Sequence, residues 1–198
     1  MAIIDTYLVF DFETTGLDPA NDRIIQVGLC EVAGGKAVSQ RSWLVRQEVP
    51  IHPEAQARHG ITAQQLREHG IAPAESLAQL VKALRAAPAL VGHNVHRFDI
   101  PFFLAECRRF KVTPPDCAGI IDTAALFKGR KLRLSRDPSE THRAYANRVL
   151  SVRVRGLSYS VEHCIADLRI QTKDLALHDA SNDAYVTHLI FQALQQLR

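Results

Sequence analysis

The order of hydrophobic patterns along the chain restricts the fold more than any other feature of the sequence. Three strand-like segments come first: the apolar run YLVFDFE, and the runs RIIQVGLCEV and KAVSQRSWLV, which flank the Gly34-Gly35 pair typical of a hairpin turn. Helical patterns then alternate with short strand-like runs, as in ALVGHN and AGIIDTAALF. This order predicts one α/β domain over residues 1–198, with a mixed central sheet flanked by helices.

Several helices are expected from apolar residues that recur at helical spacing. In AESLAQLVKALRAA the leucines and valine fall on one face, and FDIPFFLAECRRF tolerates its proline in the first turn. DPSE predicts a helix that begins after Asp137 as N-cap and stops near Gly156. Two further amphipathic helices are expected over 157–168 and 186–197.

The composition is that of an ordinary globular protein, with 46% hydrophobic and 23% charged residues. No run of about 18 apolar residues is present, and the N-terminus MAIIDTYLVF lacks the charged region and cleavage site of a signal peptide. The four cysteines form no CxxC pair and no zinc-binding spacing. We therefore expect a cytoplasmic protein with reduced thiols and no membrane association.

Positive charge is concentrated in one segment. Residues 128–156 contain nine Lys or Arg and two Asp or Glu, whereas the rest of the chain is slightly acidic. A basic insertion on an acidic body is typical of proteins that bind a polyanion, although a solvated loop or a surface for a protein partner explains the same charges. We hypothesise that the following cations contact backbone phosphates without reading bases: Lys128, Arg130, Lys131, Arg133 and Arg136.

Two carboxylates stand at the end of the first strand-like run. In FDFETTGL, Asp11 and Glu13 are two residues apart, so on a strand both side chains point to the same face. Like charges repel, and a divalent cation such as Mg²⁺ or Mn²⁺ relieves the repulsion through hard oxygen ligands. An exposed acidic strand end is the alternative reading. The glycine turn that follows can present backbone N–H groups to an anion.

Two more acidic positions stand at predicted helix starts. Asp99 in GHNVHRFD directly precedes an apolar helix, where an N-cap explains it equally well. In LHDASNDAY, Asp183 falls in the first turns of the last helix, and His178 lies five residues earlier on the loop that leads in. Helix capping alone would account for this stretch too.

Together the four carboxylates and the histidine match the needs of two-metal phosphodiester hydrolysis. Two cations about 3.5–4 Å apart stabilise the attacking and leaving oxygens, and carboxylates hold them in place. A histidine can accept the proton of the attacking water near neutral pH. The combined pattern predicts a metal-dependent nuclease centre.

The same segments resemble the motifs of the DEDDh 3′→5′ exonucleases, the family that contains the proofreading epsilon subunit of bacterial DNA polymerase III. VFDFETTGL is similar to the first motif, VGHNVHRFDIPFF to the second, and HDASNDA to the third, which has the form His-x-Ala-x-x-Asp-Ala. PEAQARHGIT and IDTAALF resemble two further family elements. The resemblance covers nearly the whole chain and implies an RNase H-like exonuclease fold.

The resemblance also implies a role for each matching residue. The metal ligands would be Asp11, Glu13, Asp99 and Asp183, holding two Mg²⁺ ions that Mn²⁺ can replace, and His178 would be the general base. The terminal nucleotide would be bound by Thr14, Thr15, Gly16, Leu17, Glu54, His59, Asn94 and Phe98, with Leu17 as a wedge. Asp179 and Asn182 match no family role and are expected to be caps or solvent-facing groups.

The expected activity is removal of nucleotides from a single-stranded or frayed 3′ end, with DNA as the expected substrate and 5′-mononucleotides as products. Trimming of RNA ends and a nucleic-acid-binding scaffold role are the alternatives, because sequence does not reveal contacts to the 2′ position. A small-molecule phosphohydrolase is disfavoured by the basic segment. Because the sequence ends at Arg198, just after the last helix, we expect no tail of the kind that holds the epsilon subunit to its polymerase, which argues against a replicative proofreading role but not against the nuclease chemistry. A DNA polymerase or repair partner is not resolved by the sequence.

Overall fold

The computed structural model describes residues 3–172, 175 and 177–197. Its centre is a five-stranded sheet in the order β3-β2-β1-β4-β5. β1, β2 and β3 pair antiparallel, whereas β1–β4 and β4–β5 are parallel, so the predicted mixed sheet is confirmed. The strands are β1 (Tyr7–Thr14), β2 (Ile24–Ala33), β3 (Lys36–Leu44), β4 (Leu90–Gly92) and β5 (Ile121–Asp122).

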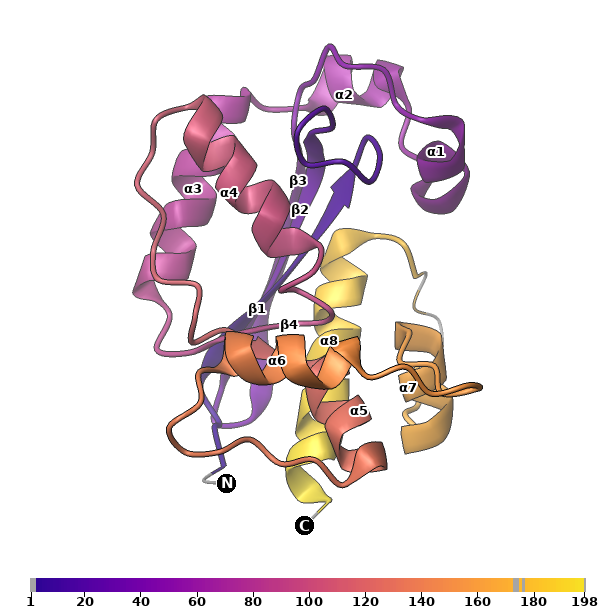
Figure 1. Ribbon diagram of the computed structural model, residues 1–198. Coiled ribbons are helices and arrows are strands. Elements are labelled where there is room, and N and C mark those ends of the chain that lie inside the picture. Colours follow the sequence, from indigo (N-terminus) through magenta and orange to yellow (C-terminus); the bar gives the residue numbers. More distant parts are fainter. Residues whose placement is uncertain (1–2, 173–174, 176, 198) are drawn as a thin grey trace.

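Helices cover both faces of this sheet (Figure 1), with α3 and α4 on one side and α8, α5 and α7 on the other. The helices in the described part of the chain are α1 (Pro53–His59), α2 (Ala63–His69), α3 (Pro73–Ala86), α4 (Asp99–Arg109), α5 (Thr123–Leu132), α6 (His142–Ser151), α7 (Val161–Leu168) and α8 (Ala180–Gln196). Within the described ranges, no helix combines the length and the apolar character needed to cross a bilayer.

Alternating side chains of β1 divide the hydrophobic interior into two cores. The even-numbered apolar residues of β1 belong to the core shared with α3 and α4, whereas Tyr7 and Val9 belong to the core shared with α8. Asp11 and Glu13 continue the second series, because side chains of a strand alternate between its faces. The two acids therefore lie on the α8 face of the sheet.

The hairpin and the third helix agree with the sequence patterns. Gly34 and Gly35 connect β2 to β3 with φ values of 57° and 73°, a left-handed conformation that glycine adopts without steric cost. The apolar face predicted for the segment that forms α3 is buried as expected, at Leu77, Leu80, Val81 and Leu84.

The helix predicted to begin after Asp137 begins later. Asp137 forms a turn instead: its Oδ1 accepts a hydrogen bond from the Ser139 backbone N–H at 2.8 Å, and such local bonding competes with helix formation. Thr141 is the N-cap of α6, since its side chain accepts from the backbone N–H of Ala144. The helix ends at Ser151, well before Gly156.

The hypothesis of a row of phosphate-binding cations from Lys128 to Arg136 is contradicted for Lys128, and three of the other cations have partners within the chain. Lys128 is only 4% exposed, and its Nζ donates to two backbone carbonyls at the end of α6. Lys131 forms an ion pair with Asp167, with 2.6 Å between Nζ and Oδ1. Arg130 and Arg136 donate to backbone carbonyls. The charge of the segment must be judged residue by residue.

Candidate active site

A cavity of about 790 Å³ lies beside the carboxyl-terminal half of β1. Its walls come from β1 and the turn after it, α1, the loop before α4, the segment 156–162 and the start of α8. The carboxylates that line it are Asp11, Glu13, Asp99, Glu162 and Asp183. Four elements that are far apart in sequence therefore bring their acidic groups to one cavity.

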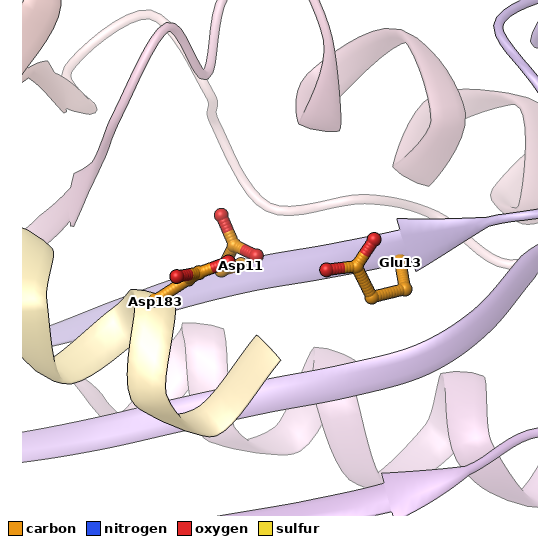
Figure 2. Close-up of side chains that lie close together, drawn as sticks. All are labelled: Asp11, Glu13 and Asp183. Atoms are coloured by element: carbon orange, nitrogen blue, oxygen red, sulfur yellow. The ribbon is translucent and has the colours of Figure 1, made fainter. Parts of the chain in front are cut away.

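Three of these carboxylates form a compact group. Oxygen atoms of Asp11, Glu13 and Asp183 all lie within 4.8 Å of one another. Figure 2 shows the first two on β1 and the third at the start of α8, with the carboxylate of Glu13 pointing toward the other two. An all-oxygen set at this spacing suits a hard divalent cation such as Mg²⁺ or Mn²⁺. Asp99 is outside this group of three but lines the same cavity.

The position of Asp183 depends on a close contact between α8 and the sheet. Gly28 is the β2 partner of Asp11, and a Cβ at Gly28 would lie 2.0 Å from the backbone carbonyl of Ala180. The first residue of α8 therefore rests directly on the sheet, where a strand glycine permits close backbone approach. Asp183, one turn further along the helix, is held against the carboxylates of β1.

Asp99 is not an N-cap, which was the alternative reading of its motif. It is the first residue of α4, and the N-cap position belongs to Phe98, which makes no side-chain capping bond. β4 pairs with β1 only at Leu8 and Val9, so the edge of β1 is open beyond these residues. The Phe12 backbone N–H donates to Asp99 Oδ1 at 3.2 Å in that open position. Asp99 is 2% exposed.

Burial and mutual repulsion make these carboxylates hold protons strongly. Burial, followed by the charge of Asp183, raises the pKa of Glu13 to about 8. Burial and the neighbouring carboxylates raise the pKa of Asp11 well above its usual range. Burial likewise raises the pKa of Asp99 and of Asp183. A bound divalent cation would replace these protons, because it offsets the same repulsion.

His178 lies on the loop before α8, as expected, and faces the cavity. Its φ of 70° is uncommon for a residue other than glycine, and such conformations concentrate at functional sites. The backbone N–H of His178 donates to Asp183 Oδ2 at 3.1 Å, which fixes the two residues relative to each other. Nε of Arg58 lies 3.5 Å from Nδ1 of the imidazole, a long contact.

Asp179 has the capping role that was one of the two expected. Its side chain accepts from the backbone N–H groups of Ser181 and Asn182, and its Oδ2 accepts from Nε2 of Gln26 at 2.8 Å. Gln26 also accepts from the backbone N–H of Ala180 at 3.1 Å. The start of α8 is thus fixed to β2 by a pair of hydrogen bonds.

Most residues expected to bind the nucleotide line the cavity, but two do not. Thr14, Gly16, Leu17, His59, Asn94 and Phe98 line it. The Thr15 side chain is fully buried and its Oγ1 donates to Asp22 Oδ1 at 2.9 Å, so it has a structural role. Glu54 is exposed on the first turn of α1 and does not reach the cavity wall.

Two of the cavity-lining residues, Leu17 and Asn94, have unusual environments. Leu17 is 83% exposed at the cavity, an unusual state for a large apolar side chain. Asn94 has a buried Oδ1 without a hydrogen-bond partner, while its backbone N–H donates to Asp122 Oδ1 at 3.0 Å. A buried acceptor of this kind is expected to find a donor, and the cavity is where a ligand would supply one.

Among the cavity residues that the sequence did not single out, four have titratable side chains: Arg58, His93, Tyr159 and Glu162. Arg58 precedes His59 in PEAQARHGIT, and the charge of its guanidinium lowers the pKa of Asp11 and Glu13 against the larger effects of burial and acidic neighbours. His93 connects two walls, since Nδ1 lies 2.8 Å from Thr123 Oγ1 and Nε2 lies 2.8 Å from the Tyr159 carbonyl oxygen. Arg58 and His93 lie within the quoted motifs PEAQARHGIT and VGHNVHRFDIPFF, whereas no motif contains Tyr159 or Glu162.

A mixed sheet covered by helices on both faces, with clustered carboxylates at its central strand, defines an RNase H-like nuclease fold. Residues 8–191 match the model of the family described as "Exonuclease", named RNase_T, and the chain belongs to this family. Its DEDD-type motifs, expected from resemblance, agree with that assignment.

Curated relatives and solved structures show the same relationship. The chain is 35% identical over 97 residues to the PolC-type DNA polymerase III of Thermotoga maritima, and 32% identical over 121 residues to that of Streptococcus mutans. These matches cover 49% and 60% of this chain, but 7% and 8% of the polymerases, so the chain spans less than a tenth of their length.

Among solved structures, a zinc-bound E. coli exonuclease I complex with single-stranded DNA matches with a TM-score of 0.76 and 21% identity, covering 97% of this chain and 40% of that one. E. coli exonuclease I with a dT13 oligonucleotide gives a TM-score of 0.74 at 20% identity, covering 98% and 42%. At these identities the likeness establishes the RNase H-like exonuclease fold.

Proposed function

We propose that this chain is a metal-dependent 3′→5′ exonuclease that releases 5′-mononucleotides from single-stranded or frayed DNA ends. The observation that carries the proposal is the group of three carboxylates within 4.8 Å, beside His178 in one cavity. Membership of the exonuclease family supports the reaction. The relatives named as DNA polymerase III, and the structures of exonuclease I with single-stranded DNA, support DNA as the substrate and a role in replication or repair.

The proposed cation ligands are Asp11, Glu13, Asp99 and Asp183. Two divalent cations held there, Mg²⁺ or Mn²⁺, would stabilise the attacking and leaving oxygens of the phosphodiester. The raised pKa values mean that cation binding must displace protons, so the carboxylates bind metal better as the pH rises.

His178 is the proposed general base for the attacking water. The Arg58 guanidinium lies 3.5 Å from Nδ1 of His178 and restricts the approach of water to that nitrogen. Proton transfer to Nδ1 would require Arg58 to move away from it. An incoming phosphate offers the exposed guanidinium a stronger, bidentate partner, and its arrival would free the base.

The terminal nucleotide is proposed to occupy the cavity between Leu17 and Phe98. An exposed apolar side chain at Leu17 can wedge between the last base and its neighbour, while the Phe98 ring supplies an apolar surface. The unpartnered Oδ1 of Asn94 can accept a hydrogen bond from the substrate. Gly16 leaves no room for a side chain, because a Cβ would lie 2.4 Å from Asp22 Oδ2.

The proposal is tested by digestion of 5′-labelled single-stranded DNA and RNA of equal sequence, with Mg²⁺, with Mn²⁺ and with EDTA. We expect labelled DNA fragments that become shorter from the 3′ end, with 5′-mononucleotides as the released products. No digestion is expected in EDTA. A preference for RNA would assign the chain to RNA trimming instead. Binding without digestion by a preparation that holds the cation would overturn the nuclease assignment.

A further inference from the structure

A second cavity, of about 740 Å³, adjoins the candidate active site. Leu157 and Tyr159 line both cavities, so these two residues form the partition between them. The rest of the second cavity is formed by the end of α6 and the chain between α6 and α7, which is orange in Figure 1, together with Arg97 and Lys128. We call this second cavity the basic pocket.

The charge of the basic pocket is opposite to that of the active site. Its charged lining residues are Arg97, Lys128, Arg153 and Arg155, and no carboxylate occurs among the described residues that line it. Arg153 and Arg155 are exposed, and no hydrogen bond or ion pair of their side chains occurs within the described part of the chain. Their charges are therefore available to a ligand.

The floor of the basic pocket is held firmly. Nζ of the buried Lys128 donates to the carbonyls of Leu150 and Val152 at 3.1 and 2.6 Å, which fixes the chain just before Arg153. The same ammonium lies 5.1 Å from the centre of the Tyr159 ring, a cation–π contact. Burial and the nearby Arg97 lower the pKa of Lys128, as expected for an ammonium in a positive environment.

The partition is fixed from both sides. On the active-site side, His93 Nε2 lies 2.8 Å from the carbonyl oxygen of Tyr159. On the other side, Nη1 of Arg97 donates to the Tyr159 hydroxyl at 3.4 Å. A ligand that extends out of the active site past Tyr159 therefore reaches the guanidinium groups of the basic pocket.

We propose that Arg97, Arg153 and Arg155 bind backbone phosphates of the strand whose 3′ end occupies the active site. This inference rests on the proposed function and names the path of the substrate beyond the scissile bond. Guanidinium groups form charge-assisted hydrogen bonds with phosphate oxygens, and such contacts do not depend on the base sequence of the strand. The cations of 128–136, by contrast, are mostly engaged within the protein.

The test compares the double variant Arg153→Gln/Arg155→Gln with a control away from both cavities, Arg67→Gln/Arg108→Gln. The control also removes two exposed charges, but its residues line neither cavity. Binding of a labelled thymidine oligonucleotide of roughly twenty residues is measured by fluorescence anisotropy in Ca²⁺ over a range of salt. Hydrolysis of the oligonucleotide is compared with that of the p-nitrophenyl ester of thymidine 5′-monophosphate, which is too short to reach the basic pocket.

We expect the Arg153/Arg155 variant to lower the slope of log affinity against log salt by about 1.4, since each lost contact on a single strand contributes about 0.7. Its kcat/KM for the oligonucleotide should fall about tenfold more than that for the ester, and the control should keep the wild-type slope. A wild-type slope in the Arg153/Arg155 variant would overturn the inference. Equal competition by polyglutamate would overturn it too, because the pocket would then take any polyanion.

Failure of the proposed function gives a different result. If the wild-type protein hydrolysed neither substrate with Mg²⁺ or Mn²⁺, the nuclease assignment would fall, whereas the salt slopes would still test the basic pocket. If the wild type hydrolysed the oligonucleotide and the Arg153/Arg155 variant had the wild-type salt slope, only the proposed role of the basic pocket would be rejected.

Discussion

Gly28 of β2 pairs with Asp11 of β1, and the backbone of α8 occupies the space that a side chain at Gly28 would need. This relationship sets the geometry of the candidate active site, because it lets the first turn of α8 lie against the sheet. Without it, Asp183 could not approach the carboxylates of β1. Gly28 has no reactive side chain, yet the space that it leaves allows the three carboxylates to lie close together.

Gly28→Ala should therefore reduce activity without removing any proposed ligand. The new methyl carbon would lie 2.0 Å from the Ala180 carbonyl, so the start of α8 must shift. We expect a loss of stability of about 1–3 kcal/mol, as for other overpacked sites, and a drop in kcat of at least tenfold. Urea denaturation and oligonucleotide digestion measure the two effects. Gly119→Ala is the control, since nothing lies within 4 Å of a Cβ there; equal behaviour of both variants would contradict the argument.

The contact at Gly28 also marks a limit of what sequence can predict. Asp11 and Glu13 were predictable as neighbours because strand alternation is a local rule. Gly28 was visible inside a strand-like run, yet the helix that approaches it lies about 150 residues away in the chain, at Ala180. The long-range contact decides the site, and no local pattern reports it.

The basic segment shows the same limit for charge. Counting residues over 128–156 predicted a surface row of cations, but Lys128 lies in the interior, where it bonds the end of α6. The start of α6 was predicted too early because Asp137 suits a helix cap and a turn equally well. Composition gives the sign of a segment's charge, whereas packing decides which groups face a ligand.

Replacement of a clustered carboxylate should separate activity from stability. Asp11→Asn or Asp183→Asn should abolish digestion, while the metal-free variant unfolds at a temperature equal to or above that of the wild type, because repulsion in the acidic group is relieved. Mn²⁺ should raise the melting temperature of the wild type and leave that of either variant nearly unchanged. Glu48→Gln, an exposed acid outside the cavity, is the control. Digestion by Asp11→Asn near the wild-type rate would disprove the metal-ligand role.

Stability of the metal-free protein should depend on pH through Glu13. Its pKa of about 8 in the folded protein exceeds the ordinary value of 4.5, so between these values the folded state binds a proton that the unfolded state releases. The free energy of unfolding contributed by Glu13 therefore falls as pH rises from about 4.5 to 8, by an amount on the order of 1 kcal/mol or more.

The measurement is urea denaturation in EDTA at several pH values, for the wild type and for Glu13→Gln. The difference in unfolding free energy, wild type minus variant, should become more negative as the pH rises. Saturating Mn²⁺ should abolish this trend in the wild type, because the cation takes the place of the proton. A difference that grows in favour of the wild type with rising pH in EDTA would show that Glu13 is ionised in the metal-free protein.

His178→Ala should lower kcat by roughly 10²–10⁴, the usual contribution of a positioned general base. Metal affinity should change little, since His178 is not a proposed ligand, and titration calorimetry with Mn²⁺ checks this. The pH dependence of kcat should flatten on its acidic side in the variant. Loss of metal affinity with an unchanged pH profile would instead make His178 a ligand and place the base elsewhere.

Arg58→Gln should raise KM, because the proposed role of this guanidinium is to leave His178 and bind the incoming phosphate. A charge-assisted hydrogen bond contributes about 1.5–3 kcal/mol, so we expect KM for the oligonucleotide to rise roughly tenfold to a hundredfold. Arg58→Lys should recover part of the loss, since it keeps the charge but not the bidentate geometry. Arg67→Gln, at an exposed position of α2, controls for the loss of one positive charge. If KM stayed at the wild-type value while kcat increased, Arg58 would only restrain the base, and the phosphate contact would be disproved.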